Sequence, residues 1–384
     1  MQHGKSFILP LPKQATMIIG VLKEPQDETR VSLLPEAVAT LTKKGITVLV
    51  EKNAGAKAFA GDNDYEVAGA QIASAMEIAT AADIILSIQT PETEISSKIL
   101  IGVYQPLYNN AFVQKAAENN LSVFSLDLLP RTTRAQSMDV LSSQANMAGY
   151  KAVILAASLY PRYLPMFMTA AGTIAPAKVL ILGAGVAGLQ AIATARRMGA
   201  VVEVFDTRPA VKEEVMSLGA KFVEVEGAAD ASTAGGYAVE QSEDYQQRQQ
   251  RRIAESIAKA DIVITTAQIP GKKAPILIPE EMLNKMRNGS VIIDIAAATG
   301  GNTPFTKNNE TVVHNGVSIV GNSNLPATMP SDASKLYSKN ILNFLNLIIN
   351  KEGVINLNWE DDLVKGSCIT HASEVVNERV KMLS

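Results

Sequence analysis

Residues 177–208 constrain the fold of this chain more than any other stretch of the sequence. Residues 177–182 form a short apolar run between turn signals, which predicts a buried parallel strand. Apolar side chains then recur at helical spacing as far as Gly199, a typical residue at the end of a helix. A second apolar run, 201–205, leads to Asp206. This succession of strand, helix and strand predicts a parallel α/β sheet.

The turn between the first strand and the helix has the G-x-G-x-x-G spacing of dinucleotide-binding sites. Gly183 permits a tight turn, Gly185 leaves room for a pyrophosphate, and Gly188 lets the helix pack closely on the strand. The free N–H groups at the start of the helix favour phosphate. Asp206 follows at the distance where a carboxylate binds the ribose hydroxyls of NAD and repels the 2′-phosphate of NADP, although Arg208 weakens that selectivity. The candidate contacts are Gly183, Gly185, Val186, Ala187, Gly188, Asp206, Thr207 and Arg208. The alternative is a glycine turn with a structural role alone.

Length and composition narrow the remaining possibilities. A chain of 384 residues is too long for one ordinary core and suits two domains. The net charge of -3 gives no reason to expect nucleic-acid binding, and no apolar run reaches the roughly 18–20 residues that cross a bilayer. The single cysteine, Cys368, excludes an internal disulfide and fits a reducing compartment, while three histidines argue against a metal cluster. Residues 1–16 are expected to form a disordered extension.

The first half of the chain alternates predicted strands and helices, which indicates a parallel sheet covered on both faces. Strands are expected at 17–22, 46–51, 84–88, 99–104 and 121–126. This half carries no glycine fingerprint, so we assign it no nucleotide. Lys23, Glu24 and Arg30 follow the first strand, where open α/β sheets bind ligands. They are interpreted either as a substrate or partner contact, or as charges of an exposed loop.

A polar segment, 130–150, joins the two apolar halves and reads PRTTRAQSMDVLSSQANMAGY. A long helix is expected from Ser137 to about Tyr160. Interdomain hinges often hold a ligand cleft. The alternative is a hinge that bridges the domains in water.

Loops of the second half follow its predicted strands. The loop 268–273 follows a predicted strand, 261–267, and is expected to lie over the dinucleotide, with Ala267 and Gln268 as candidate contacts. Asn324 is expected to reach the nicotinamide end. Residues 227–244 form a long segment of small and polar residues with one large residue, Tyr237. This composition indicates a lid over the nucleotide, and the alternative is an exposed linker. Residues 311–320 predict a hairpin about Asn315-Gly316.

The polar segment resembles the signature of the NAD(H)-binding component of proton-translocating nicotinamide nucleotide transhydrogenases. The resemblance extends from about Met17 to the C-terminus, and its other matching segments are 168–173, 183–195, 233–238, 264–272 and 290–294. It implies an α/β fold of two Rossmann-like doubly wound parallel-sheet domains with a cleft between them. The first domain, of a flavodoxin-like catalytic type, is expected at 17–136 plus 328–384, and the NAD-binding domain at 137–327.

The resemblance also implies the chemistry of the site. Arg131, Gln136, Asp139 and Ser142 are expected to surround the nicotinamide and its ribose, with Gln136 orienting the ring. Direct hydride transfer between two nicotinamides needs no proton donor, but it needs the rings at about 3–3.5 Å in a site without water. NAD(H) is expected on this chain and NADP(H) on a partner subunit.

The same family implies an assembly and a place in the cell. Partners are expected to be the membrane-spanning and NADP(H)-binding subunits and a second copy of this chain, with no transmembrane segment of its own. The chain is expected to be cytoplasmic and peripheral on the inner membrane, or on the matrix side in a mitochondrion.

Two alternatives remain. Alanine dehydrogenases, which are structural relatives, use a histidine acid–base residue and a substrate lysine, and the aligned places here are near Gln105 and Ser87. No histidine lies between His3 and His314, so amino-acid oxidation lacks its proton carrier. Many transhydrogenases also keep a lysine near Ser87, so this position departs from the family pattern. The other alternative is a non-catalytic NAD sensor, which would need no loop such as the one that carries Gln136.

Overall fold

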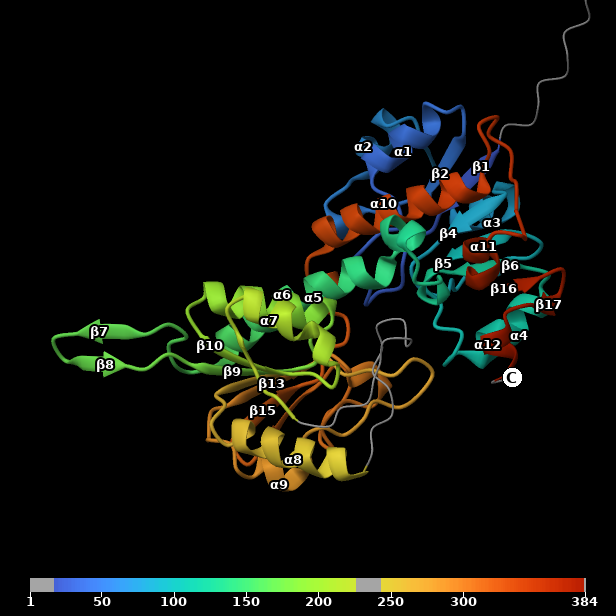
Figure 1. Cartoon of the computed structure of the whole chain (residues 1–384). Coiled ribbons are helices and arrows are strands. Elements are labelled where there is room, and N and C mark those ends of the chain that lie inside the picture. The colour runs from blue at the N-terminus through green and yellow to red at the C-terminus, as the bar shows by residue number, and fades with distance from the viewer. Residues whose placement is uncertain (1–16, 226–242, 383–384) are drawn as a thin grey trace, which may run out of the picture. The chain divides into compact units, whose positions relative to one another are not determined.

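The computed structural model describes residues 17–225 and 243–382 (Figure 1). The chain divides into two compact units, Met1–Met138 with Tyr337–Ser384, and Asp139–Leu336. The expected boundaries, after residues 136 and 327, lie two and nine residues before these divisions. The second division falls inside the continuous helix α10 (Pro330–Ile348), which has no break in its sequence to mark it.

The first unit contains an eight-stranded sheet with the order β17-β16-β6-β5-β4-β1-β2-β3. Pairings among β1 to β6 are parallel, and β16 joins β6 in antiparallel fashion. The strands are β1 (Ile18–Val21), β2 (Thr47–Glu51), β3 (Gln71–Ala73), β4 (Ile84–Leu86), β5 (Ile99–Gly102), β6 (Ser122–Ser125), β16 (Cys368–His371) and β17 (Glu374–Val375). The first six strands have the Rossmann order, which corrects the flavodoxin-like expectation: β1 pairs with β2 on one side and with β4 on the other.

Helices cover both faces of this sheet because its central strands, β4 and β5, are buried at every position and carry apolar side chains toward both faces. Ile85 and Leu100 belong to the core that includes residues of α3 and α4. Phe124 packs against Phe344 of α10, with the ring centroids 5.6 Å apart. The helical segments of this unit are α1 (Pro35–Thr42), η1 (Ala56–Ala58), α2 (Asp62–Val67), α3 (Ala75–Ala81), α4 (Asn110–Glu118), η2 (Leu126–Leu128), η3 (Thr133–Met138), α11 (Asp362–Ser367) and α12 (Glu378–Lys381).

The second unit contains a seven-stranded sheet with the order β11-β10-β9-β12-β13-β15-β14. All pairings are parallel except that of β14 with β15, whose hairpin confirms the turn expected at Asn315-Gly316. The strands are β9 (Lys178–Leu182), β10 (Val201–Phe205), β11 (Lys221–Phe222), β12 (Ile262–Thr265), β13 (Val291–Asp294), β14 (Thr311–His314) and β15 (Val317–Val320). Counted from β9, the first five strands have the Rossmann order, β15 takes the sixth place, and the order reverses between β9 and β12.

Figure 1 shows α5 and α6 on one face of the second sheet and α8 and α9 on the other, in agreement with its two apolar clusters. The expected start of the long helix at Ser137 was wrong, because Asp139 caps α5 and the helix begins at Val140. The helical segments are α5 (Val140–Leu159), α6 (Val186–Arg197), η4 (Pro209–Val211), α7 (Lys212–Ser217), α8 (Glu243–Ile257), α9 (Glu280–Leu283), η5 (Ala297–Thr299) and η6 (Leu325–Thr328).

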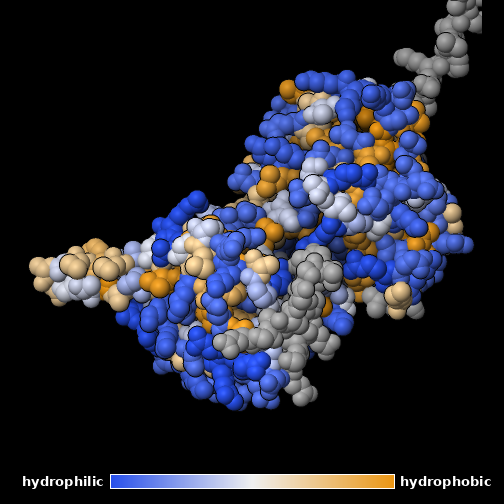
Figure 2. Space-filling model, in the orientation of Figure 1, coloured by the Kyte–Doolittle hydropathy of each residue, from blue (hydrophilic) through white to orange (hydrophobic). Residues whose placement is uncertain are grey.

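A two-stranded hairpin of β7 (Phe167–Thr169) and β8 (Gly172–Ile174) projects from the body of the second unit (Figure 1). All of its strand residues are exposed, and Figure 2 shows apolar residues along it. Met168 is 70% exposed, and Phe167 stacks on Tyr163 at 5.1 Å. This hairpin was not expected, because its strands are only three residues long and have no buried face.

Candidate dinucleotide site

The turn from β9 into α6 has the geometry that phosphate binding requires. Gly183 has φ +107°, a conformation that side chains disfavour. A Cβ at Gly185 would meet no atom within 4 Å, so the backbone there is open to a ligand, whereas a Cβ at Gly188 would clash with the carbonyl oxygen of Gly183. The helix that follows, beginning with Val186 and the buried Ala187, is 12 residues long and directs its free N–H groups toward this turn.

Asp206 lies at the end of β10 and is 8% exposed. Its Oδ2 accepts a hydrogen bond of 2.7 Å from the backbone N–H of Ala184, which links the carboxylate to the glycine turn. Arg208 donates to both carboxylate oxygens, Nε to Oδ1 at 2.9 Å and Nη2 to Oδ2 at 2.7 Å. This hydrogen bonding raises the pKa of Arg208, against the effect of burial. Thr207 stands between the two residues, so the three predicted residues form one corner of the site.

The loop after β12 is held by a residue that the sequence analysis missed. Asn302 is fully buried, and its amide accepts from the N–H of Ala267 at 3.2 Å and donates to the Ala267 carbonyl at 2.9 Å. Gln268 donates to the carbonyl of Ile295 at 3.2 Å. Asp294 in turn accepts from the N–H of Asn302 at 2.6 Å. The start of the predicted loop is therefore held at the carboxyl edge of the sheet by hydrogen bonds to Asn302 and Ile295.

Two further predictions concern loops of this unit. Asn324 follows β15 and precedes η6, and its N–H donates to the side chain of Asn322 at 2.9 Å. The predicted lid residue Tyr237 lies outside the described residues.

The four residues expected around the nicotinamide fall on both sides of the division between the units. Arg131 and Gln136 belong to the first unit, where both are exposed. Asp139 and Ser142 belong to the second and contact each other: Asp139 accepts from the N–H of Ser142 at 2.9 Å and from its hydroxyl at 2.6 Å. This pair forms the N-cap of α5, a structural role that the sequence analysis did not assign.

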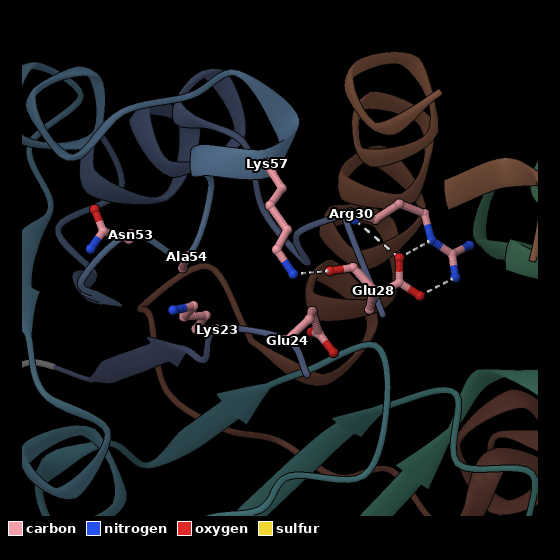
Figure 3. Close-up of a pocket in the computed structure, with 7 residues that line it drawn as sticks. All are labelled: Lys23, Glu24, Glu28, Arg30, Asn53, Ala54 and Lys57. Atoms are coloured by element: carbon pink, nitrogen blue, oxygen red, sulfur yellow. Dashed lines mark hydrogen bonds and ion pairs between the residues drawn. The ribbon is translucent and has the colours of Figure 1, made fainter. Parts of the chain in front are cut away.

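In the first unit, a polar pocket lies at the carboxyl end of β1, lined by Lys23, Glu24, Glu28, Arg30, Asn53, Ala54 and Lys57 (Figure 3). Glu28 and Arg30 form a two-point ion pair, with Nε to Oε1 at 2.8 Å and Nη2 to Oε2 at 2.6 Å. Lys57 donates to the carbonyls of Gln26 at 2.6 Å and Glu28 at 3.3 Å. The structure therefore brings together the three residues singled out in this loop, and most of these charges are partnered.

Glu24 is 5% exposed, and burial raises its pKa to about 7 although it accepts N–H bonds from Gln89 at 3.0 Å and Ile88 at 2.6 Å. The interpretation of an exposed loop with solvated charges is thus wrong for Glu24, but it holds for Lys23, which is exposed. A ligand for this pocket remains a prediction.

The two positions that distinguish alanine dehydrogenases follow neighbouring strands of the first sheet, Ser87 directly after β4 and Gln105 shortly after β5. Ser87 is buried and its hydroxyl is 3.0 Å from that of Tyr104. Gln105 follows with φ +49°. Neither a serine hydroxyl nor a glutamine amide gains or loses a proton near neutral pH, so these two positions offer no acid–base group.

The chain is similar to known proteins over most of its length. The N-terminal and C-terminal domains of the family described as alanine dehydrogenase/PNT match residues 20–148 and 152–378. A protein of Rickettsia prowazekii that is named as a part of the NAD(P) transhydrogenase subunit alpha is 45% identical over 94% of this chain and 96% of its own. The crystal structure of transhydrogenase from Sinorhizobium meliloti has 45% identity and a TM-score of 0.85, covering 94% of this chain and 100% of its own. An alanine dehydrogenase from Staphylococcus epidermidis is 28% identical over 87% of this chain and 88% of its own.

Fold and site define a nucleotide-binding protein of two Rossmann-like doubly wound units, as predicted. The chain belongs to the alanine dehydrogenase/PNT family, and within it to the branch of the NAD(P) transhydrogenase alpha subunits. The family implies NAD(H) binding, and the open backbone at Gly185 with the adjacent helix start fits that cofactor. Alanine dehydrogenase is a more distant relative, so that alternative is weakened. Within the described ranges, 17–225 and 243–382, no helix is long and apolar enough to cross a membrane.

Proposed function

We propose that this chain is the NAD(H)-binding subunit of a proton-translocating transhydrogenase. A hydride would pass from C4 of NADH to C4 of NADP⁺ on a partner subunit, which oxidises the first nucleotide and reduces the second without release of a proton. The observation that carries the proposal is the hydrogen bond from the N–H of Ala184 to the Asp206 carboxylate. It places the carboxylate beside the glycine turn, so that one dinucleotide could contact the carboxylate through its ribose and the turn through its phosphates.

The residues of this chain would bind and orient. The start of α6, with Val186 and Ala187, would hold the pyrophosphate, and Asp206 the adenosine ribose. Gln136, Arg131, Asp139 and Ser142 would position the nicotinamide and its ribose. The loop residues proposed to complete the cofactor site are Thr207, Arg208, Ala267, Gln268 and Asn324.

The proposed assembly includes a membrane-spanning subunit, an NADP(H)-binding subunit and a second copy of this chain, peripheral on the cytoplasmic face of the inner membrane or on the matrix side in a mitochondrion. The β7–β8 hairpin supports the second copy. An isolated two-stranded hairpin is marginal in water, and exposed apolar side chains such as Met168 favour burial against a partner. The proposal is that the hairpin is covered by the other protomer.

The test is a hydride-transfer assay of the purified chain with NADH and an oxidised NAD analogue, with and without the NADP(H)-loaded partner subunit. We expect transfer only when the partner is present. L-alanine with NAD⁺ is the parallel assay, and turnover by the chain alone would overturn the proposal in favour of amino-acid oxidation. Gln136→Asn should bind NADH normally and transfer hydride slowly, so unchanged transfer would remove Gln136 from the site.

A further inference from the structure

The segment that carries Gln136 is a 3₁₀ helix, η3, of six residues. Runs of this conformation longer than three or four residues are uncommon, because the hydrogen-bond geometry is poor. Ala135 and Met138 are buried, whereas Gln136 and Ser137 are exposed. The buried pair fixes one side of the segment, so the position of Gln136 depends on what holds the other.

Two asparagines of α10 hold the carbonyl that follows Gln136. The Nδ2 atoms of Asn340 and Asn343 donate to the Ser137 oxygen at 2.9 and 3.0 Å. The two are three residues apart, so they lie on one face of the helix. The Ser137 carbonyl thus accepts two hydrogen bonds from a helix that lies more than 200 residues further along the chain.

An arginine holds the other end. Nη2 of Arg134 lies 2.6 Å from Oδ1 of Asp361 and 2.9 Å from Oδ1 of Asp362. Asp361 also caps α11 by accepting from the N–H of Leu363 at 2.9 Å. Its burial would raise its pKa, but the hydrogen bond from Arg134 and the backbone N–H groups outweigh that effect and lower it.

These contacts are placed to position rather than to stabilise. Arg134 is 58% exposed at its side chain, and exposed ion pairs contribute little to the free energy of unfolding. Yet the two anchors bracket Gln136, two residues before it and one residue after it. A small displacement of an orienting group costs far more in rate than in stability.

We propose that Arg134, Asn340 and Asn343 are positioning residues for Gln136. They hold the segment through Asp361, Asp362 and the Ser137 carbonyl, so that the Gln136 amide has one location when the nicotinamide is bound. This inference rests on the proposed role of Gln136 in hydride transfer.

The test uses the full chain with its partner subunits and the variants Arg134→Ala, Asn343→Ala and Gln136→Asn. We expect the first two to slow hydride transfer about tenfold while the Kd for NADH changes less than about twofold. Arg134→Lys should restore part of the rate because it keeps one charged contact. Arg252→Ala, which removes a similarly exposed arginine paired with Glu255 on α8, should transfer at the wild-type rate.

A double-mutant cycle separates positioning from general damage. Arg134→Ala should add less than about a twofold loss to Gln136→Asn, because the amide of the shorter asparagine side chain is already displaced from the orienting position. Full additivity would overturn the proposal, as would unchanged transfer in both single variants or a parallel loss of NADH binding.

Hydrogen exchange of the amides of residues 133–138 provides a readout that does not need hydride transfer. Faster exchange in Arg134→Ala and Asn343→Ala, but not in Arg252→Ala, is expected. If the wild-type complex transfers no hydride while exchange responds in this way, the proposed function fails and the anchoring stands. Unchanged exchange would overturn the anchoring whatever the activity.

Discussion

At the scale of single residues, the carboxylate of Asp206 has two hydrogen-bond partners, Ala184 and Arg208, with different effects. The N–H of Ala184 connects it to the phosphate turn, and Arg208 neutralises it. Because a free guanidinium beside the adenosine ribose would attract a 2′-phosphate, we propose that Asp206 suppresses NADP(H) binding both by its own charge and by its ion pair with Arg208.

Asp206→Ala should therefore weaken NADH binding by about tenfold or more and strengthen NADPH binding. The variant would then prefer NADH over NADPH less strongly than we expect of the wild type. Fluorescence titration of both nucleotides measures it. Asp206→Asn is the matched control, since it keeps an acceptor for Ala184 while removing the charge. An unchanged ratio of the two affinities in both variants would contradict this account.

Glu24 gives a second prediction at this scale. Its pKa, raised from 4.5 to about 7 by burial, means that the folded chain binds a proton more tightly than the unfolded chain. The stability from this group is complete below pH 4.5 and is lost as the pH rises through 7, by on the order of 3 kcal/mol. Glu24→Gln should remove this loss, so the variant gains stability relative to the wild type between pH 5 and 8.

Urea unfolding followed by the fluorescence of Trp359, the single tryptophan, reports on the first unit. The matched control is Glu36→Gln, which alters an exposed carboxyl on α1 and should leave the pH dependence as it is. Parallel curves for the wild type and Glu24→Gln would show that Glu24 is ionised throughout.

At the scale of elements, local patterns predicted most of the two sheets. The apolar run before Gly183 forms the expected strand, and the Asn315-Gly316 turn joins the two strands of the expected hairpin. Both were predictable because the residues that determine them lie within a short stretch of sequence. The strands β16 and β17 were missed because β16 depends on pairing with β6, far away in the sequence, and β17 pairs in turn with β16. For the same reason, no local pattern could identify Asn302 or Asn340 as anchors.

The β7–β8 hairpin, also missed, is the element on which dimerisation is proposed to depend. Replacing both Phe167 and Met168 with serine should convert the dimer to a monomer at micromolar concentration, with NADH affinity unchanged, because the hairpin is proposed to be buried between protomers. Sedimentation analysis measures the mass. Val313→Ser, an equally exposed apolar position on β14, should remain dimeric. A dimer that survives the double substitution would exclude the hairpin as its contact.

At the scale of the whole molecule, the glycine fingerprint predicted where a nucleotide binds, but not how the chain is divided. Both sheets follow the Rossmann order, yet only the second carries the fingerprint. The polar pocket at β1 occupies the corresponding edge of the first sheet, where Glu28 pairs with Arg30, Glu24 accepts backbone N–H groups and Lys57 donates to backbone carbonyls. The signal that sequence reasoning used there, Lys23 with Glu24 and Arg30, could not reveal these partners.

The insertion of one unit within the other also matters during synthesis. The second unit, complete at Leu336, can fold as it leaves the ribosome, whereas the first lacks β16 until residues 368–371 have been made. Until then β6 is an open strand edge of the kind that pairs with other chains. A premature stop after Leu336 would leave a fragment with an intact phosphate turn, but one that aggregates rather than competing with the full-length chain for nucleotide.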